Sequence, residues 1–447
     1  MKKQMEIRLR GTEKKSVLII TMLLMTISFA CQKEISTSIE PDTPPATAQI
    51  KFQKTYGGPN DEYIGNVQQT NDSGYVIIGT TMSYGAGDED IYVIKVNAQG
   101  NMQWSKTYGT LNTEEGYNIK QTKDGGFILS GVGEGFDSFI LMKTDAGGNI
   151  QWHKNYGYFG VGYNYDVQLT DDGGYIIVGS ASPYATLCIK TDGNGNILWC
   201  KNYSVGRNVS FAKTIDGGYA IVGRTEIGWG IYCTQLIKID ANGNLLWSKG
   251  YGVGSHPMSM KKTTDGGFII TGEAYNYGTG NNSDVYVMKT DANGNRIWFK
   301  TYGGTNPEGA WEIEETTDGG YIFSGSTGNY GEGHVLVIKA DSSGKVTWSK
   351  TYGGGKEPYS FVHQTKDGGF IIASETSAFG AGSSDIYLIK TDNNGNAGCY
   401  ENSFSLNVTA PAVLETNPSV AISIGSIFFT VDLKSGTGGI ETTLCHK

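Results

Sequence analysis

The sequence predicts an all-β fold in which one four-stranded unit occurs seven times and closes into a ring. Three observations lead to this prediction. Glycine accounts for 65 of the 447 residues, about twice the usual share of roughly 7%, while only 10 residues are proline. A short Asp-Gly-Gly motif recurs every 44 to 53 residues. A second motif, which contains Trp, lies between its copies.

The first motif is Asp-Gly-Gly followed by Tyr or Phe and then by β-branched residues, which favour strands. Asp-Gly is typical of type I′ turns, so the motif predicts a tight hairpin between the first two strands of each unit. A variant copy, Asp72-Ser73-Gly74-Tyr75, comes first. The other six copies begin at Asp124, Asp172, Asp216, Asp265, Asp318 and Asp367.

The second motif is Ile-Lys-Thr-Asp-x-Asn-Gly-Asn-x-x-Trp-x-Lys-x-Tyr-Gly. Its clearest copy starts at Asp291 and leads to Trp298, Lys300 and Tyr302. The Asp-x-Asn-Gly-Asn run predicts a second hairpin, between the third and fourth strands. The same run resembles part of an EF-hand loop but lacks the glutamate at the twelfth place. We therefore expect a structural turn and assign no cofactor, with Ca²⁺ binding at these turns as the open alternative.

Four strand signals occupy each unit. In the fifth unit one precedes Asp265, and the others cover 268–271, 285–289 and 296–302. Four antiparallel strands repeated at this period are the signature of a β-propeller. The last unit stops at Asn396 without its Trp strand, whereas residues 50–58 read as a fourth strand with Phe52 in place of Trp. An N-terminal strand is therefore expected to complete the last blade and to remove two open sheet edges.

The fourth-strand motif resembles the Trp-docking repeat of quinoprotein-type and outer-membrane-assembly propellers. Over residues 50–396 the whole repeat resembles propeller repeats in secreted proteins of Gram-negative bacteria. This resemblance implies architecture only. Quinone-binding residues are not implied, because the sequence contains no matching site.

The first thirty residues read as a signal peptide. Six basic residues within Met1–Lys15 precede an apolar run, Val17–Ala30, which is too short for a membrane span. The run ends in Ser28-Phe29-Ala30-Cys31, which resembles a bacterial lipobox with Ser28 in the usual place of Leu. The resemblance implies lipidation, including palmitate, at Cys31. An ordinary cleaved signal is the alternative.

These features divide the chain into four parts: a signal peptide (1–30), a lipidated Cys with a flexible tether (31–49), a seven-bladed propeller (50–396) and a small C-terminal β appendage (397–447). Gln32-Lys33-Glu34 looks like a surface-export tag of some outer-membrane lipoproteins, so we expect display on the cell surface. A formal charge of −9 argues against a nucleic-acid partner. We expect a monomer.

Strand alternation places both kinds of hairpin on one face of the ring and the other loops on the opposite face, where the copies differ. Variable loops on a rigid scaffold commonly bind ligands. Carboxylates beside aromatic rings are typical of carbohydrate sites, provided that Glu62, Glu308 and Glu357 face the mouth. Packing between blades is the alternative role for the aromatic residues. The candidate ligand-binding residues are Glu62, Tyr63, Glu114, Tyr117, Tyr163, Tyr165, Arg207, His256, Glu308, Trp311, Glu357 and Tyr359.

The sequence favours a non-catalytic binding module whose ligand is a glycan or an envelope or secreted protein. None of the five histidines lies at a metal-binding spacing, and no Gly-x-Ser-x-Gly motif stands in a strand-to-helix context. One alternative is a structural scaffold for an envelope complex. Another is a glycan-cleaving enzyme, which would need two carboxylates facing each other about 5–9 Å apart.

Cysteines mark the last segment. Cys399 and Cys445 bracket it, and a disulfide between them would fasten the predicted appendage in an oxidising compartment. Cys188 and Cys200 flank one hairpin and could face each other, which leaves Cys233 unmatched. Buried thiols are the alternative for these three residues.

Overall fold

The computed structural model describes most of the chain from Gln49 onward. The predictions on the signal peptide, on Cys31 and on the tether therefore lie outside the described residues. No helix that could span a membrane occurs in the described part of the chain. The described residues are 49–133, 138–158, 166–181, 185–228, 230–275, 282–328, 333–355, 359–413, 415–416, 422–424, 434–436 and 440–446.

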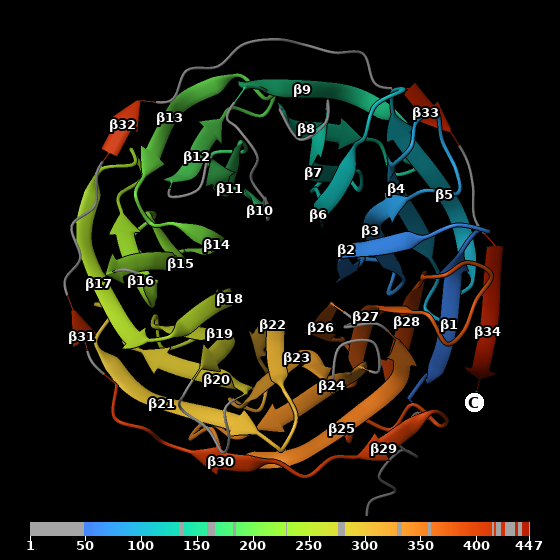
Figure 1. Ribbon diagram of the computed structural model, residues 1–447. Helices are drawn as coiled ribbons and strands as arrows, with labels where there is room; N and C mark the ends of the chain where they lie inside the picture. Colours follow the sequence, from blue (N-terminus) through green and yellow to red (C-terminus); the bar gives the residue numbers. More distant parts are fainter. Residues whose placement is uncertain are drawn as a thin grey trace, which may run out of the picture. The chain divides into compact units, whose positions relative to one another are not determined.

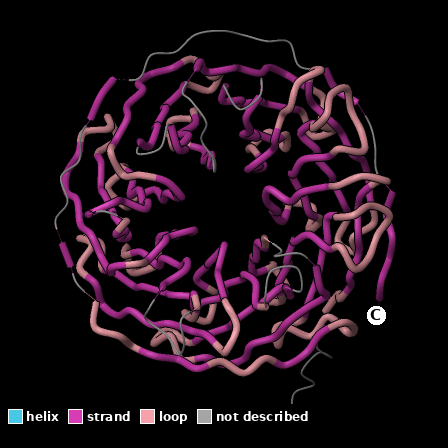
Figure 2. The backbone as a smooth tube through the Cα atoms, viewed as in Figure 1, coloured by secondary structure: helices cyan, strands magenta, loops and turns pink. Residues whose placement is uncertain are grey.

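Seven antiparallel sheets stand around a central axis as the blades of a β-propeller (Figure 1). Every regular element of the described part is a strand (Figure 2). Blade 1 consists of β2 (Glu62–Gln69), β3 (Tyr75–Thr81), β4 (Asp90–Val96) and β5 (Met102–Gly109). Blade 2 consists of β6 (Glu115–Gln121), β7 (Phe127–Gly133), β8 (Ser138–Thr144) and β9 (Ile150–Tyr158). Blade 3 consists of β10 (Asp166–Leu169), β11 (Tyr175–Ala181), β12 (Ala185–Thr191) and β13 (Ile197–Tyr203).

Blades 4 to 7 continue the same order, with the innermost strand first. Blade 4 consists of β14 (Arg207–Lys213), β15 (Tyr219–Gly228), β16 (Ile231–Ile239) and β17 (Leu245–Val253), and blade 5 of β18 (Ser255–Lys262), β19 (Phe268–Tyr275), β20 (Ser283–Thr290) and β21 (Arg296–Gly303). Blade 6 consists of β22 (Glu308–Glu315), β23 (Tyr321–Thr327), β24 (Gly333–Ala340) and β25 (Val346–Gly355). Blade 7 consists of β26 (Ser360–Gln364), β27 (Phe370–Thr376), β28 (Asp385–Thr391) and β1 (Phe52–Gly57).

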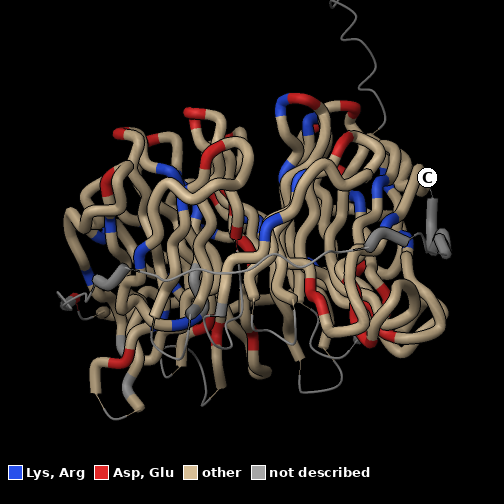
Figure 3. Tube along the Cα trace, turned by 90° about the horizontal axis from the view of Figure 1, so that it is seen from above, with Lys and Arg blue, Asp and Glu red and all other residues tan. Residues whose placement is uncertain are grey.

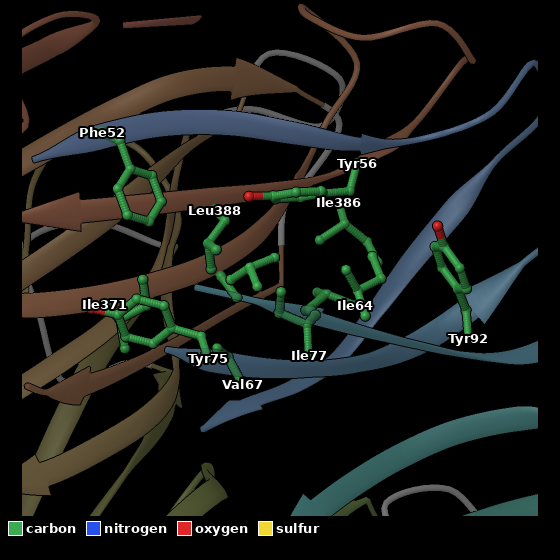
Figure 4. Close-up of a cluster of buried hydrophobic side chains, with 13 residues drawn as sticks. Phe52, Tyr56, Ile64, Val67, Tyr75, Ile77, Tyr92, Ile371, Ile386 and Leu388 are labelled. Atoms are coloured by element: carbon green, nitrogen blue, oxygen red, sulfur yellow. The ribbon is translucent and has the colours of Figure 1, made fainter. Parts of the chain in front are cut away.

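The N-terminal strand closes the ring, as the sequence predicts. Strand β1 pairs antiparallel with β28, with Phe52 opposite Lys390 and Tyr56 opposite Ile386. A buried apolar cluster then joins blade 7 to blade 1 through side chains such as Phe52, Val67 and Leu388 (Figure 4). Seven such clusters fill the seven interfaces between neighbouring blades.

The predicted type I′ turn between the first two strands is wrong. A type I′ turn needs positive φ at two consecutive residues. In this turn of blade 2, Gly125 is the one residue with positive φ, at 84°. The Gly125 amide donates to the Thr122 carbonyl, and the Thr122 amide donates to the Gly126 carbonyl. The hairpin loop therefore has three residues and ends in a left-handed glycine, which is a common alternative to the two-residue loop.

The second motif docks each blade onto the next. The Tyr108 hydroxyl donates to the Gly148 carbonyl of the following blade at 2.5 Å. Gly148 has φ +76°, and a Cβ at this position would lie 3.0 Å from the Trp104 ring. The repeated Trp, Tyr and turn Gly are thus parts of one contact, and the corresponding Tyr hydroxyl bond occurs between all seven pairs of neighbouring blades.

The Asp of this second turn is used by the turn itself. Asp145 accepts backbone hydrogen bonds from Gly147 at 2.9 Å and Asn149 at 2.8 Å through Oδ1, and the Asn149 side chain donates to Oδ2. Both carboxylate oxygens therefore accept hydrogen bonds within the turn, which is the structural role that the sequence predicts for this Asp.

An ion pair that the sequence analysis missed links the two motifs within every blade. In blade 2 the Lys143 ammonium lies 2.8 Å from Asp124 Oδ2 and also donates to the Thr144 carbonyl. This bond and the Thr122 hydroxyl lower the pKa of Asp124 to about 2. The loops at the top of Figure 3 carry both acidic and basic segments. The seven pairs are Lys95–Asp72, Lys143–Asp124, Lys190–Asp172, Lys238–Asp216, Lys289–Asp265, Lys339–Asp318 and Lys390–Asp367.

These pairs predict a loss of stability in acid. A carboxylate whose pKa is lower in the folded state stabilises the fold above its unfolded pKa of about 4, and this contribution disappears as the pH falls through about 2. Each aspartate is about half exposed, so we expect only ~0.2–1 kcal/mol from each pair. Urea midpoints at pH 7, 4 and 2.5 measure the effect, and Asp124→Asn should lose less between pH 4 and 2.5 than the unchanged protein. Equal losses would contradict the prediction.

The C-terminal segment forms short β-strands, as the sequence predicts, and the structure adds where these strands lie. It runs around the outside of the ring against chain order, and each described strand adds a fifth, antiparallel strand to one blade (Figure 1). We call this segment the belt. Its strands are β29 (Glu401–Ser403) on blade 6, β30 (Asn407–Thr409) on blade 5, β31 (Glu415–Thr416) on blade 4, β32 (Ile422–Ile424) on blade 3, β33 (Lys434–Gly436) on blade 1 and β34 (Ile440–His446) on blade 7.

Cys399 stands where the belt leaves blade 7, and it is disulfide-bonded. The backbone of Cys445 lies opposite Gln53 of β1, and the Gln53 side chain donates to the Cys399 carbonyl. The start and the end of the belt therefore meet at one residue of β1. A bond between Cys399 and Cys445 stays a prediction, which this placement supports. Cys188, Cys200 and Cys233 are buried, reduced thiols.

Candidate functional site

The innermost strand of each blade lines a central channel with alternating side chains. Counted back from the Thr that follows the strand, the third residue of every copy is fully buried between blades, as with Val67, Ile119 and Ile313. The fourth residue faces the channel and is polar in six of the seven copies. These fourth residues are Asn66, Asn118, Asp166, Ser210, Ser259, Glu312 and Phe361.

A cavity of about 700 Å³ occupies the channel and its mouth on the variable-loop face. β-Bulges supply part of its wall, because pairing skips one residue in several inner strands. The extra residues are Gly65, Tyr117, Met258 and Trp311, and all four line the cavity. A bulge redirects a side chain, so aromatic residues reach the channel at positions where regular pairing would not place them.

Four of the predicted ligand residues meet in this cavity: Tyr63, Tyr117, Trp311 and Tyr359. Trp311 and Tyr359 come from neighbouring blades, and their ring centroids lie 4.7 Å apart in an edge-to-face contact. Tyr63 is 39% exposed and Tyr359 is 50% exposed, so both rings offer accessible surface. Tyr163, Tyr165 and Glu357 lie outside the described residues.

Glu62, Glu114 and Glu308 do not face the mouth, which corrects the prediction for these three residues. Each is at most 1% exposed. Glu308 accepts hydrogen bonds from the Gly304 amide at 2.9 Å and the Thr327 hydroxyl at 2.8 Å. Glu62 accepts the corresponding bonds from the Gly58 amide and the Thr81 hydroxyl. Glu114 accepts both bonds from Thr110, one from its amide and one from its hydroxyl. These carboxylates hold the loops that enter the inner strands.

Arg207 and His256 are also absent from the described lining of the cavity. Arg207 is exposed. The His256 ring packs against Tyr232 and Tyr275, and Arg224 stacks on Tyr232 at 3.9 Å from the ring centroid. Burial, together with the Arg224 guanidinium, lowers the pKa of His256 to about 4. This cluster packs blade 4 against blade 5.

Six charged residues of the described wall are missing from the sequence-based candidate set, namely Glu89, Glu115, Asp166, Lys261, Glu312 and Glu375. Asp166 and Glu312 could have been found by aligning the fourth residue before each Thr. Glu89 and Glu375 come from a loop and a second strand, and no recurrent motif marks them. The Lys261 ammonium lies 2.5 Å from Glu312, and although burial opposes ionisation, this contact lowers the pKa of Glu312.

The carboxylates nearer the mouth are not paired in this way. Burial raises the pKa of Glu375 to about 7, even though the Ile64 amide donates to it at 3.0 Å. Burial also raises the pKa of Glu115, which accepts a 2.5 Å hydrogen bond from Tyr117 and is repelled by Glu89. Carboxylates are therefore concentrated at the mouth, where burial disfavours their ionised form.

Several buried polar atoms of the wall have no hydrogen-bond partner among the described residues. They include Asn118 Oδ1 and Trp311 Nε1 in the main cavity, and Asp61 Oδ1 in an adjoining cavity of about 750 Å³. An unpaired buried polar group costs about 1–3 kcal/mol, so such atoms mark places where water or a ligand completes the hydrogen bonding. No cluster of three or more metal-ligating side chains occurs in the described part.

The sequence matches no known family model and no curated protein. Solved structures with similar folds include a protein of unknown function from Bacteroides caccae (14% identical residues, 61% of this chain, 92% of that chain, TM-score 0.39). A second is BBS1N in complex with ARL6DN, with 12% identical residues, 76% of this chain and 95% of that chain covered, and a TM-score of 0.47. A third is AztD from Citrobacter koseri, with 10% identical residues, 83% of this chain and 99% of that chain covered, and a TM-score of 0.40. These likenesses are distant and carry no argument on function.

Proposed function

We propose that this chain is a non-catalytic binding module that takes its ligand in the mouth of the propeller channel. We further propose that a lipid on Cys31 displays it on the outer-membrane surface, which palmitate labelling of cells and its loss in Cys31→Ala would test. The observation that carries the binding proposal is the cavity of about 700 Å³, whose size lies in the usual range for ligand sites.

The composition of the wall supports a ligand role over mere packing. Tyr117, Met258 and Trp311 sit at bulges and differ from copy to copy, whereas the residues that join the blades are repeated. Asn118 and Trp311 present unpartnered polar atoms in the described structure. A cavity that combines exposed rings with polar atoms can both attract and orient a ligand.

Between the two ligand classes, a protein segment is favoured over a glycan. The glycan hypothesis requires Glu62 and Glu308 to accept sugar hydroxyls at the mouth, and both are buried in their own loops. The carboxylates that do line the mouth would complement the basic side chains of a protein.

Trp311→Ala is expected to weaken ligand retention at least tenfold, because a central aromatic anchor is typically worth about 2 kcal/mol or more. The measurement is retention of the purified chain on a basic-peptide array and on a polysaccharide panel. Leu111→Ala is the matched control, because Leu111 lies on the same face, is 84% exposed and does not line the cavity. Equal losses in both variants, or no retention on either panel, would overturn the proposal.

A further inference from the structure

The walls of the main and adjoining cavities carry an excess of negative charge on the side of blades 1, 2 and 7. Five carboxylates line them there: Asp61, Asp88, Glu89, Glu115 and Glu375. Glu89 and Glu115 are common to both cavities. Lys261 is the sole basic residue in the described lining, and its ammonium is engaged by Glu312 at 2.5 Å. In side view, the corresponding face, at the bottom, carries mainly acidic segments (Figure 3).

Aromatic rings stand among these carboxylates. Asp61, Glu375 and Glu89 all act electrostatically on the Tyr63 hydroxyl, so the Tyr63 ring lies within the acidic region. Tyr117 donates to Glu115 and lines the same cavity as Trp311. A cation over the face of Tyr or Trp is attracted by the ring as well as by the carboxylates.

Unpartnered acceptors give an observation that is independent of the charge. Asn118 is only 7% exposed and lines the main cavity, yet its Oδ1 has no donor among the described residues. Asp61 Oδ1, in the adjoining cavity, is likewise buried without a donor in the described part. A ligand that supplies N–H donors would satisfy both atoms.

The arrangement suits an organic cation better than a metal ion. Metal ions need several ligand atoms converging on one point, and the described residues contain no cluster of that kind. An ammonium or guanidinium group is larger, carries three or five N–H donors respectively and can use rings and separated carboxylates together.

We propose that the channel mouth binds an organic cation, either an alkylammonium or a guanidinium group. Glu89, Glu115 and Glu375 supply the opposing charge, Tyr63 and Trp311 supply ring faces, and Asn118 accepts a hydrogen bond. This inference rests on the proposed function and specifies the chemistry of its ligand. The group could belong to a free polyamine or to the Lys and Arg side chains of a partner protein.

The test is titration calorimetry of the purified chain with two cationic probes, spermidine and a hexa-arginine peptide, beside neutral maltohexaose. Saturable binding of a cation is expected, and Glu89→Gln/Glu115→Gln should weaken it about tenfold or more. The control variant Asp171→Asn/Glu415→Gln removes the same charge at sites outside both cavities, where each exposed carboxylate pairs with a partly exposed cation. It should bind the cation as the unchanged protein does.

The probes separate the possible results. Binding of spermidine alone indicates a free amine as the source, and binding of the peptide indicates a protein partner. No saturable binding of either cation, or an equal loss in the control variant, overturns this inference. If maltohexaose binds instead and Trp311→Ala abolishes its binding, the cavity remains the site and only the cation assignment fails.

Discussion

Cys399→Ala is expected to lower the free energy of unfolding by up to about 4 kcal/mol, because a disulfide that closes a loop of about 45 residues restricts the unfolded chain by that amount. Cys399 is disulfide-bonded, and we expect Cys445 to be its partner, since the backbone of Cys445 pairs with Gln53 beside the Cys399 carbonyl. The bond would turn the belt into a covalent ring around the blades. Guanidinium midpoints with and without reductant measure the effect.

Two further variants make this result specific. Cys445→Ala should cost as much as Cys399→Ala, and the double variant should cost no more than either, because all three lack the same bond. Cys233→Ala is the control, since Cys233 is a buried thiol outside any disulfide. This variant keeps the Cys399 disulfide, so its midpoint should still fall when reductant is added, whereas the midpoint of Cys399→Ala should not change. Additive losses in the double variant would show that the two cysteines do not share one bond.

Glu308→Ala is expected to cost about 2–4 kcal/mol in unfolding free energy. The substitution removes a 1% exposed carboxylate that accepts from the buried Thr327 hydroxyl and from the partly buried Gly304 amide, and a buried donor that loses its acceptor costs about 1–3 kcal/mol. Urea unfolding followed by Trp fluorescence measures the loss, and ligand binding by the remaining folded protein should be unchanged.

Glu315→Ala is the matched control for this prediction. Glu315 also accepts a backbone and a hydroxyl hydrogen bond, both from Thr264, but these bonds are exposed, so water can replace the lost carboxylate. We expect its cost to stay under about 1 kcal/mol. If Glu308→Ala were no more costly than Glu315→Ala but abolished ligand binding, Glu308 would be a ligand residue after all.

The blade architecture could be predicted because the same residues, with simple physical roles, recur in every blade. The strand pattern, the two recurrent turns and the missing fourth strand of blade 7 led to the ring and to its closure by β1, and strand pairing confirms both. The Trp, Tyr and Gly of the second motif recur because each blade makes the same contact with the next.

The site was predicted only in part, and the β-bulges explain why. Counting back from Thr316 by twos, Glu308 falls on the same side of the strand as Glu312 and so would face the channel. Trp311 is an extra residue in the strand, so the alternation of sides is reversed before it. Glu308 therefore points into its own loop, and the Trp311 indole lines the cavity. Sequence alternation assumes regular pairing and cannot locate such an insertion.

The belt could not be predicted for a different reason. Most of its strands have only two or three residues, and they carry no repeated motif. Their positions are set by the outer edges of the blades, which become available only once the ring exists. Val413, at 8% exposure, joins the apolar cluster between blades 4 and 5, so even single belt residues complete cores that belong to distant parts of the sequence.

The pairing between β1 and β28 also governs how the chain folds and unfolds. Its partners, such as Phe52 and Lys390, are more than 300 residues apart, so the ring cannot close until the last blade has been made. Contacts at such long sequence separation form slowly, and two sheet edges stay open meanwhile and are prone to mispairing with other chains. Once closed, the ring has no terminal blade from which unravelling could begin. The lifetime of the folded protein should then depend on the barrier to opening the pairing between these two strands, so that its persistence is set by an unfolding rate as well as by an equilibrium.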